Sequence, residues 1–245
     1  MDDKKLALQL IPLIDHTNLN PNASTAEIET LCRQAVTPHA SVAAVCICPQ
    51  YIQQAKKLLQ HTTVHVATVC NFPAGDFEIN HTLKEITQAM EQGADEIDVV
   101  LPYVALSQGK VAYVSDYLNQ CRAACGNSVI LKVILETGYL STIELITQAT
   151  TLAIASGADF IKTSTGKIKP GATLESVSAI IKVIAAQQKK VGIKISGGIQ
   201  TLVQIKPIYQ LIVTSLGINW IDSSHIRIGS SSLLIDLKQI ANSIK

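Results

Sequence analysis

Three lysines, Lys132, Lys162 and Lys194, lie within short runs that otherwise have the apolar, β-branched composition of buried strands. An unpaired ammonium group in an apolar interior is costly, so such a lysine is either paired with a carboxylate or kept neutral by a lowered pKa. A neutral lysine amine attacks carbonyl carbon and forms a Schiff base. The pattern therefore indicates Schiff-base chemistry, but it does not say which lysine is the nucleophile.

The charged residues of these runs share one face of their strands, because side chains alternate between the two faces. In the run 96–101, Glu96 and Asp98 lie opposite Ile97 and Val99. The same alternation adds these residues to the charged or polar face: Asp15, Thr17, Lys132, Glu136, Lys162, Ser164, Lys194 and Ser196. We expect this face to point into the fold, with the apolar face packed against helices.

A buried ion-pair network that only sets the geometry of the fold is the alternative explanation, and for any single lysine it has about even odds. Three lysines on neighbouring strands weaken that alternative, because like charges repel unless their closeness is useful. A neighbouring cation and partial desolvation lower the pKa of a lysine from ~10.4 toward ~7, which supplies the neutral amine.

Eight strand-like runs alternate with helix-like segments such as 77–92 and 141–156. The runs span 13–17, 41–47, 64–70, 96–101, 129–136, 160–165, 191–196 and 225–229. For 245 residues this gives roughly 31 residues per strand–helix unit, the usual length of one such unit. The pattern predicts a parallel sheet closed into an α/β (β/α)8 TIM barrel. A doubly wound open sheet is the alternative, but the first run lacks a following G-x-G-x-x-G turn.

One domain spanning residues 1–245 is expected, because no Pro- or Ser-rich linker divides the chain. Two helix-like segments end in the same way, with Gly93-Ala94-Asp95 and Gly157-Ala158-Asp159, each just before a strand-like run. Glycine suits the left-handed position that follows a helix. This shared Gly-Ala-Asp ending is the nearest feature to an internal repeat.

Composition excludes several classes of partner. The formal net charge is +1 and no basic stripe dominates, so neither nucleic acid nor an anionic membrane surface is an expected partner. No stretch of about 20 uncharged apolar residues is present, so no membrane span is expected. The start, MDDKKLALQL, lacks the apolar region of a secretory signal, and we expect reduced cysteines and a cytoplasmic location.

No metal or other cofactor is expected. The six cysteines lack paired CxxC spacing, and the six histidines (16, 39, 61, 65, 81 and 225) form no HExxH or other compact metal signature. His61 and His65 are interpreted as surface or packing residues. Cys46 is interpreted as a small inward core residue rather than a nucleophile, and Trp220 as a packing residue.

Glycine and serine clusters follow each of the last three strand-like runs: Gly166-Lys167, Gly197-Gly198 and Gly229-Ser230-Ser231-Ser232. In barrels of this class the loops after the seventh and eighth strands often bind phosphate at a helix N-terminus. Glycine lets backbone N–H groups approach the phosphate oxygens, and serine adds hydroxyl donors. Any one cluster could be an ordinary turn, but their joint placement favours phosphate binding.

Several of these motifs together resemble the 2-deoxyribose-5-phosphate aldolases, class I, metal-free aldolases on a (β/α)8 barrel. The resemblance runs in order from about Leu13 to Leu234. It is carried by AAVCICP (43–49), NFPAG (71–75), EIDVV (96–100), LKVILETG (131–138), FIKTSTGK (160–167), KISGG (194–198) and RIGSSSLL (227–234).

The resemblance implies a role for each matching residue. Lys162 matches the Schiff-base lysine, Asp98 the aspartate that transfers protons through a bound water, and Lys194 the lysine that tunes the nucleophile. Lys132 matches a supporting active-site lysine, and Asp15 and Cys46 match positions lining the cavity. The residues that match the phosphate-binding loops are Gly166, Lys167, Gly197, Gly198, Gly229, Ser231 and Ser232.

The implied activity is reversible cleavage of 2-deoxy-D-ribose 5-phosphate to D-glyceraldehyde 3-phosphate and acetaldehyde, a step of deoxyribonucleotide catabolism, without a cofactor. One departure is the end of the sequence, LKQIANSIK, which lacks the terminal tyrosine of some relatives. This leaves open another proton donor or slower proton exchange at the acetaldehyde methyl group. Another lysine-dependent aldolase, a non-catalytic barrel that senses a sugar phosphate, and a homodimeric assembly also stay open.

Overall fold

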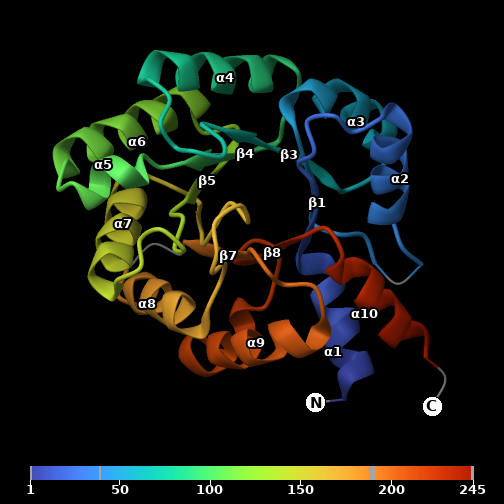
Figure 1. The fold of residues 1–245 in the computed structure, drawn as a ribbon. Coiled ribbons are helices and arrows are strands. Elements are labelled where there is room, and N and C mark those ends of the chain that lie inside the picture. Colours follow the sequence, from blue (N-terminus) through green and yellow to red (C-terminus); the bar gives the residue numbers. More distant parts are fainter. Residues whose placement is uncertain (1, 39, 188–190, 244–245) are drawn as a thin grey trace.

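The structure, a computed structural model, describes residues 2–38, 40–187 and 191–243. One histidine of the sequence analysis, His39, lies outside the described residues. Eight parallel strands form a closed barrel in which each strand pairs with the next and the last pairs with the first. Helices surround this barrel (Figure 1). The predicted (β/α)8 architecture is confirmed.

Each predicted strand run overlaps one strand of the barrel. The strands are β1 (Ile14–Asn18), β2 (Ala44–Ile47), β3 (His65–Cys70), β4 (Glu96–Val100), β5 (Ile130–Ile134), β6 (Phe160–Lys162), β7 (Gly192–Ser196) and β8 (Ile226–Ser230). The clearest difference is β6, which ends at Lys162 instead of residue 165. Thr163 N still donates to Lys194 O at 3.0 Å, but Ser196 N donates to the Thr163 hydroxyl at 3.0 Å instead of to a backbone carbonyl.

Ten α-helices occur in the described ranges. They are α1 (Asp3–Leu10), α2 (Thr25–Ala35), α3 (Ile52–Leu59), α4 (Ile79–Glu91), α5 (Tyr103–Ser107), α6 (Val111–Cys125), α7 (Ile143–Ala155), α8 (Leu174–Ala185), α9 (Leu202–Leu216) and α10 (Leu233–Asn242). The predicted helices 77–92 and 141–156 correspond to α4 and α7. Gly93 and Gly157 follow them with φ of 94° and 87°, as the repeated ending predicts.

The chain begins outside the strand–helix alternation with α1, which lies beside α10 near both termini (Figure 1). Leu6, Ala7 and Leu10 of α1 are buried, so this extra helix covers apolar surface. Trp220 packs against the apolar core, as expected.

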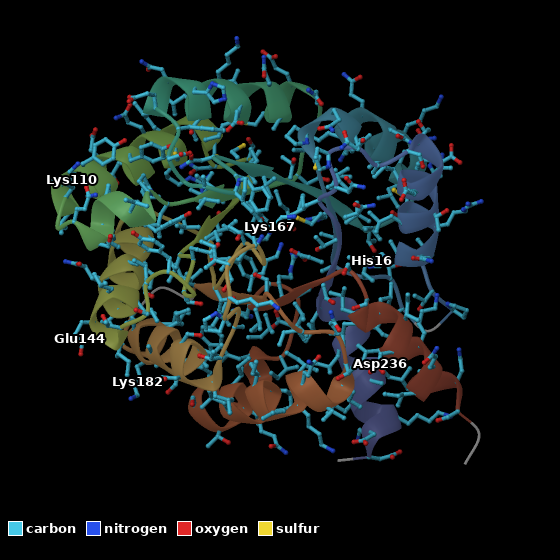
Figure 2. All side chains as sticks on the ribbon, viewed as in Figure 1. His16, Lys110, Glu144, Lys167, Lys182 and Asp236 are labelled. Carbon is cyan, nitrogen blue, oxygen red and sulfur yellow. The ribbon has the colours of Figure 1, made fainter. Side chains whose placement is uncertain are left out.

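Apolar side chains fill the layer between strands and helices. Ile97 and Val99 of β4 are fully buried in it, whereas Glu96 and Asp98 of the same strand belong to the barrel interior. Lys110, which precedes α6, Glu144 of α7 and Lys182 of α8 lie on the outer rim of the helix ring (Figure 2). None of the described helices is long and apolar enough to cross a membrane.

Candidate active site

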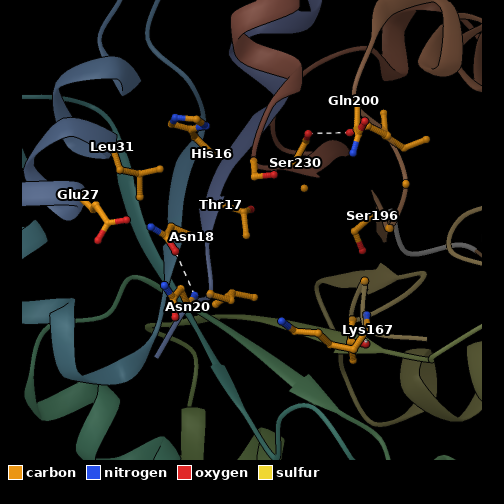
Figure 3. Close-up of a pocket in the computed structure, with 18 of the residues that line it drawn as sticks. His16, Thr17, Asn18, Asn20, Glu27, Leu31, Lys167, Ser196, Gln200 and Ser230 are labelled. Carbon is orange, nitrogen blue, oxygen red and sulfur yellow. Dashed lines mark hydrogen bonds between the residues drawn. The ribbon is translucent and has the colours of Figure 1, made fainter. Parts of the chain in front are cut away.

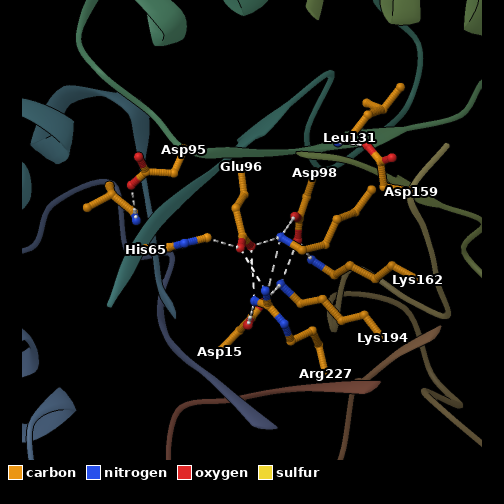
Figure 4. Close-up of polar contacts among 12 residues, drawn as sticks. Asp15, His65, Asp95, Glu96, Asp98, Leu131, Asp159, Lys162, Lys194 and Arg227 are labelled. Atoms are coloured by element: carbon orange, nitrogen blue, oxygen red, sulfur yellow. Dashed lines mark hydrogen bonds and ion pairs between the residues drawn. The ribbon is translucent and has the colours of Figure 1, made fainter. Parts of the chain in front are cut away.

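The barrel interior brings together the charged residues of six strands. These are Asp15 of β1, Glu96 and Asp98 of β4, Lys132 of β5, Lys162 of β6, Lys194 of β7 and Arg227 of β8, each at most 4% exposed. Their convergence follows from the strand alternation, because a closed barrel turns one face of every strand inward. Figure 4 shows six of them pointing toward one another: Asp15, Glu96, Asp98, Lys162, Lys194 and Arg227.

Asp98 is the common partner of the three lysines. Its Oδ1 lies 2.8 Å from Lys132 Nζ, and its Oδ2 lies 2.8 Å from Lys162 Nζ and 2.7 Å from Lys194 Nζ. Burial raises the pKa of a carboxyl group, but the three ammonium groups outweigh it and hold the pKa of Asp98 well below its usual range. Asp98 is therefore an ionised carboxylate in contact with every interior lysine.

The three lysines differ in how many carboxylates they contact. Lys132 pairs with Glu96 and Asp98 and lies 3.6 Å from Asp15. Lys194 pairs with Asp15 at 2.5 Å as well as with Asp98. Lys162, by contrast, pairs with Asp98 alone among the described residues. This asymmetry is a property of the assembled barrel, because each lysine has the same sequence pattern around it.

The different pairing separates the lysine pKa values. Burial lowers the pKa of Lys162; Asp98 opposes this, nearby Lys194 adds to it, and the resulting pKa lies below the ordinary lysine value. Burial acts on Lys132 and Lys194 too, but the carboxylates around each of them raise its pKa above the ordinary value. Of the three, Lys162 is the one shifted toward a neutral, nucleophilic amine.

Arg227 completes the network at the other end of the interior. Its guanidinium donates to Asp15 Oδ1 at 2.9 Å and to Glu96 Oε1 at 2.8 Å, and lies 5.3 Å from the centroid of the Phe160 ring. The sequence analysis missed this residue. Arg227 lies between Ile226 and Ile228 in the sequence. Because these apolar neighbours face the helices, strand alternation predicts that Arg227 points into the barrel.

His65 is half-exposed, in agreement with its interpretation as a surface or packing residue, but it also makes a contact that was not predicted. Its Nδ1 lies 2.7 Å from Oε1 of the buried Glu96. The hydrogen bond to this carboxylate raises the pKa of the half-exposed imidazole, although partial burial opposes it. His61 is exposed, as expected.

A cavity of about 980 Å³ opens where the strands end. Lys162 is the interior lysine that lines it, together with residues of the loops after β6, β7 and β8 and with the end of β1 and part of α2. Figure 3 shows Lys167 extending into this cavity. The predicted phosphate residues that line it are Gly166, Lys167, Gly197, Gly198, Gly229 and Ser231.

Six predicted site residues are not among those that line the cavity: Asp98, Lys132 and Lys194 of the charge network, and Ser232, Asp15 and Cys46. Ser232 precedes α10, and its hydroxyl is buried without a hydrogen-bond partner in the described part of the chain. Asp15 and Cys46 are fully buried beside the lysine network. Burial raises the pKa of the Cys46 thiol, consistent with a small core residue and not with a thiolate nucleophile.

The glycines of the candidate phosphate loops permit a close approach of backbones. Gly166, Gly197 and Gly198 have φ of 83°, 88° and 87°, which favour glycine. A Cβ atom added to Gly197 would lie 2.9 Å from Gly171 Cα, and one added to Gly171 would lie 2.2 Å from Gly197 O. The loops after β6 and β7 therefore come together only because side chains are absent there.

No group of three metal-ligating side chains occurs among the described residues. All six cysteines are free thiols and buried.

Comparison with known proteins identifies similar sequences and structures. A family model described as "DeoC/LacD family aldolase" matches residues 9–207. A curated protein from Agrobacterium fabrum named "Deoxyribose-phosphate aldolase" is 40% identical over 238 residues, which cover 97% of this chain and 92% of that protein.

Solved structures give the same result for the fold. A crystal structure titled as a putative deoxyribose-phosphate aldolase from Coccidioides immitis superposes with a TM-score of 0.83 at 32% identity, covering 95% of this chain and 86% of that one. A structure from Toxoplasma gondii with a similar title has a TM-score of 0.90 at 22% identity, covering 99% and 98% of the two chains. The second likeness supports the barrel alone.

Proposed function

Since the chain belongs to the DeoC/LacD family of aldolases, we propose that it reversibly cleaves 2-deoxy-D-ribose 5-phosphate to D-glyceraldehyde 3-phosphate and acetaldehyde through a lysine Schiff base. The substrate is also the one in the name of the Agrobacterium relative. One observation carries the proposal: of three buried lysines, Lys162 lines the cavity and has its pKa lowered.

The reaction begins at Lys162 Nζ. The neutral amine attacks the aldehyde carbon C1 of the open-chain sugar, and loss of water leaves a protonated imine. The C2–C3 bond then breaks, its electron pair enters the imine to form an enamine, and the C3 hydroxyl loses its proton to become the aldehyde of glyceraldehyde 3-phosphate. Protonation of enamine C2 and hydrolysis of the imine release acetaldehyde and restore Lys162.

The neighbouring charges serve this sequence of steps. Asp98, 2.8 Å from Lys162 Nζ, acts with a bound water in proton transfer. Lys194 adds a positive charge beside the same carboxylate, which keeps Lys162 neutral. Lys132 holds Asp98 from its other oxygen and supports this arrangement.

The substrate phosphate lies among the loops after the last three strands. Gly166, Gly197, Gly198 and Gly229 present backbone to the cavity, and Ser231 and Lys167 add a hydroxyl group and a cation. Ser231→Glu, which places a carboxylate against the phosphate, should raise KM far more for the phosphorylated sugar than for free deoxyribose. Equal effects on both sugars would argue against this site.

The decisive experiment is to trap the imine. Incubation with acetaldehyde and borohydride should place an N-ethyl group on Lys162, which peptide mapping locates. An adduct at Lys132 or Lys194 with none at Lys162 would overturn the assignment. A barrel that only senses a sugar phosphate would give no adduct at all. Cleavage of deoxyribose phosphate, followed by aldehyde release, tests the substrate, and it should survive exhaustive chelation.

The proposed setting of the reaction is the cytoplasm. All six cysteines are free in the structure, which is the usual state in a reducing compartment. The phosphorylated sugar and acetaldehyde are the partners that the proposal requires.

A further inference from the structure

Glu136, two residues after the end of β5, has an unusual backbone for its residue type. Its φ is 58°, in the left-handed region, and the residue is fully buried. Asn71, with φ of 54°, is the other such non-glycine residue in the described ranges. Asparagine tolerates this region, and Asn71 Oδ1 accepts a local hydrogen bond from Phe77 N at 2.9 Å. Glutamate has no such preference for a positive φ, so contacts with the surrounding structure must hold the Glu136 backbone in this conformation.

The side chain of Glu136 reaches the loop after β6. Its Oε2 accepts hydrogen bonds from the backbone N–H of Thr165, at 3.3 Å, and from the Thr165 hydroxyl. The same hydroxyl accepts from the backbone N–H of Lys167 at 3.0 Å. A directed chain of hydrogen bonds therefore runs from Lys167 through Thr165 to Glu136. Thr165, Gly166 and Lys167 line the cavity, and Glu136 is not among the lining residues.

The residues after Glu136 hold the same segment from its other side. Thr137 N donates to Thr163 O at 2.9 Å, and the hydroxyl groups of Thr137 and Ser164 lie 3.1 Å apart. Gly138 passes so close that an added Cβ would lie 2.4 Å from Pro170 O. The loop after β5 thus contacts the segment that follows Lys162, but the contact with Thr165 is made by the Glu136 side chain.

We propose that Glu136 is a positioning residue for phosphate recognition: through Thr165 it orients Gly166 and Lys167 toward the substrate phosphate without touching the substrate. The inference rests on the proposed function, because it takes this loop as the phosphate site. It makes Glu136 a determinant of the preference for phosphorylated over unphosphorylated sugars. Imine formation at Lys162 with a small aldehyde does not depend on it.

Two substitutions separate the side chain from the backbone conformation. Glu136→Gln keeps the length and leaves one carboxamide oxygen to accept both Thr165 bonds. Glu136→Asn suits a positive φ but is one methylene group shorter, so it loses the reach to Thr165. We expect Gln to stay within about threefold of the parent KM, and Asn to raise KM for deoxyribose phosphate by about tenfold or more.

The readouts distinguish positioning from a general structural role. The rate of borohydride trapping with acetaldehyde, and kcat/KM for free deoxyribose, should change less than about threefold in Glu136→Asn. Inorganic phosphate, titrated by calorimetry in the absence of any sugar, should bind the Asn variant about tenfold more weakly than the Gln variant. A variant that loses trapping as strongly as phosphate affinity would overturn the proposal, as would unchanged phosphate affinity.

Thr165 supplies a second test that does not depend on Glu136 variants folding well. Thr165→Val removes the linking hydroxyl, whereas Thr165→Ser keeps it. We expect Val, and not Ser, to weaken phosphate binding, and Thr165→Val to add little in the Glu136→Asn background. Additive losses would show that the two residues act separately and would contradict the proposal. If the parent enzyme binds phosphate and forms the Lys162 adduct but cleaves a different sugar phosphate, the substrate assignment fails while the role of Glu136 is still tested.

Discussion

The two ends of the barrel interior contain similar charges in different balance. We define the lower charge layer as Glu96, Arg227 and His65, near the strand starts, and the upper charge layer as Asp98, Lys162 and Lys194, toward the cavity. In the lower layer Arg227 donates to Glu96 and also to Asp15. Glu96 additionally contacts His65 and Lys132. In the upper layer one carboxylate, Asp98, is shared by lysines.

This difference explains how one polar core can be both scaffold and reaction site. Paired charges lose reactivity, because each opposite charge stabilises the ionised form. Burial, together with an excess of cations over carboxylates, instead leaves one lysine poorly stabilised as an ammonium group, and Lys162 is that lysine. The ion-pair network therefore describes the lower charge layer, and the proposed Schiff-base site lies in the upper charge layer.

The largest expected effect comes from removing Lys162, the proposed nucleophile of the upper charge layer. Lys162→Met should abolish imine trapping and reduce cleavage by several orders of magnitude, because no other interior lysine has a lowered pKa. Its free energy of unfolding should stay within about 1 kcal/mol of the parent, since Asp98 keeps two ammonium partners. Urea unfolding checks this, and a loss of several kcal/mol would place Lys162 with the scaffold charges.

Lys194→Leu tests whether the upper layer works through its excess of cations. Without this ammonium group, Asp98 stabilises the Lys162 ammonium more strongly, and the Lys162 pKa rises. Imine formation at pH 7 should fall strongly and recover partly at alkaline pH, because less of the amine is neutral when its pKa is higher. A pH–rate profile of trapping measures the displacement.

Lys194→Leu should also destabilise the fold by about 3–5 kcal/mol, because Asp15 and Asp98 each lose a buried partner. The unfolding experiment therefore accompanies the rate measurement, which is made under conditions where the unfolding curve shows the variant to be folded. Lower activity without an alkaline displacement would mean that Lys194 acts by proton relay or substrate positioning instead.

Glu96→Gln breaks the lower layer without touching the cavity. Arg227 and Lys132 then each lose a buried carboxylate, and we expect a loss of about 3–5 kcal/mol in the free energy of unfolding. The rate of imine trapping per folded molecule should change less than about tenfold, because Asp98 and Lys162 keep their contact. The reverse result, stable protein with little trapping, would contradict the division into two layers.

The smallest effect concerns His65 and pH. Since the contact with Glu96 raises its folded pKa, the stabilisation is fully present below the unfolded pKa of ~6.5 and is lost as pH rises through the folded value. The imidazole is half exposed, so solvent screening limits the change to less than about 1 kcal/mol. Denaturant unfolding between pH 5 and about 9 should show this slope in the parent and not in His65→Gln. Identical slopes would exclude His65 from the ionised part of the lower layer.

Strand alternation and unit length determined most of the fold and the composition of the interior from sequence alone. Apolar residues on one face and charged residues on the other are a local pattern of period two, and a closed parallel barrel is its natural outcome for eight units. The same rule placed Asp15, Asp98, Lys132, Lys162 and Lys194 in one interior correctly. It also applied to Arg227, although that residue was overlooked.

The tertiary structure alone decided what each charge does. Alternation gives the face of a side chain but not its distance to residues on other strands, and pKa depends on those distances and on burial. Lys132, Lys162 and Lys194 have equivalent local patterns, yet the barrel surrounds two of them with several carboxylates and leaves Lys162 with Asp98 beside the cavity. Likewise the strand alternation placed Glu136 on the inward face. Its hydrogen bond with Thr165 depends on the approach of the loop after β6, which only the tertiary structure shows.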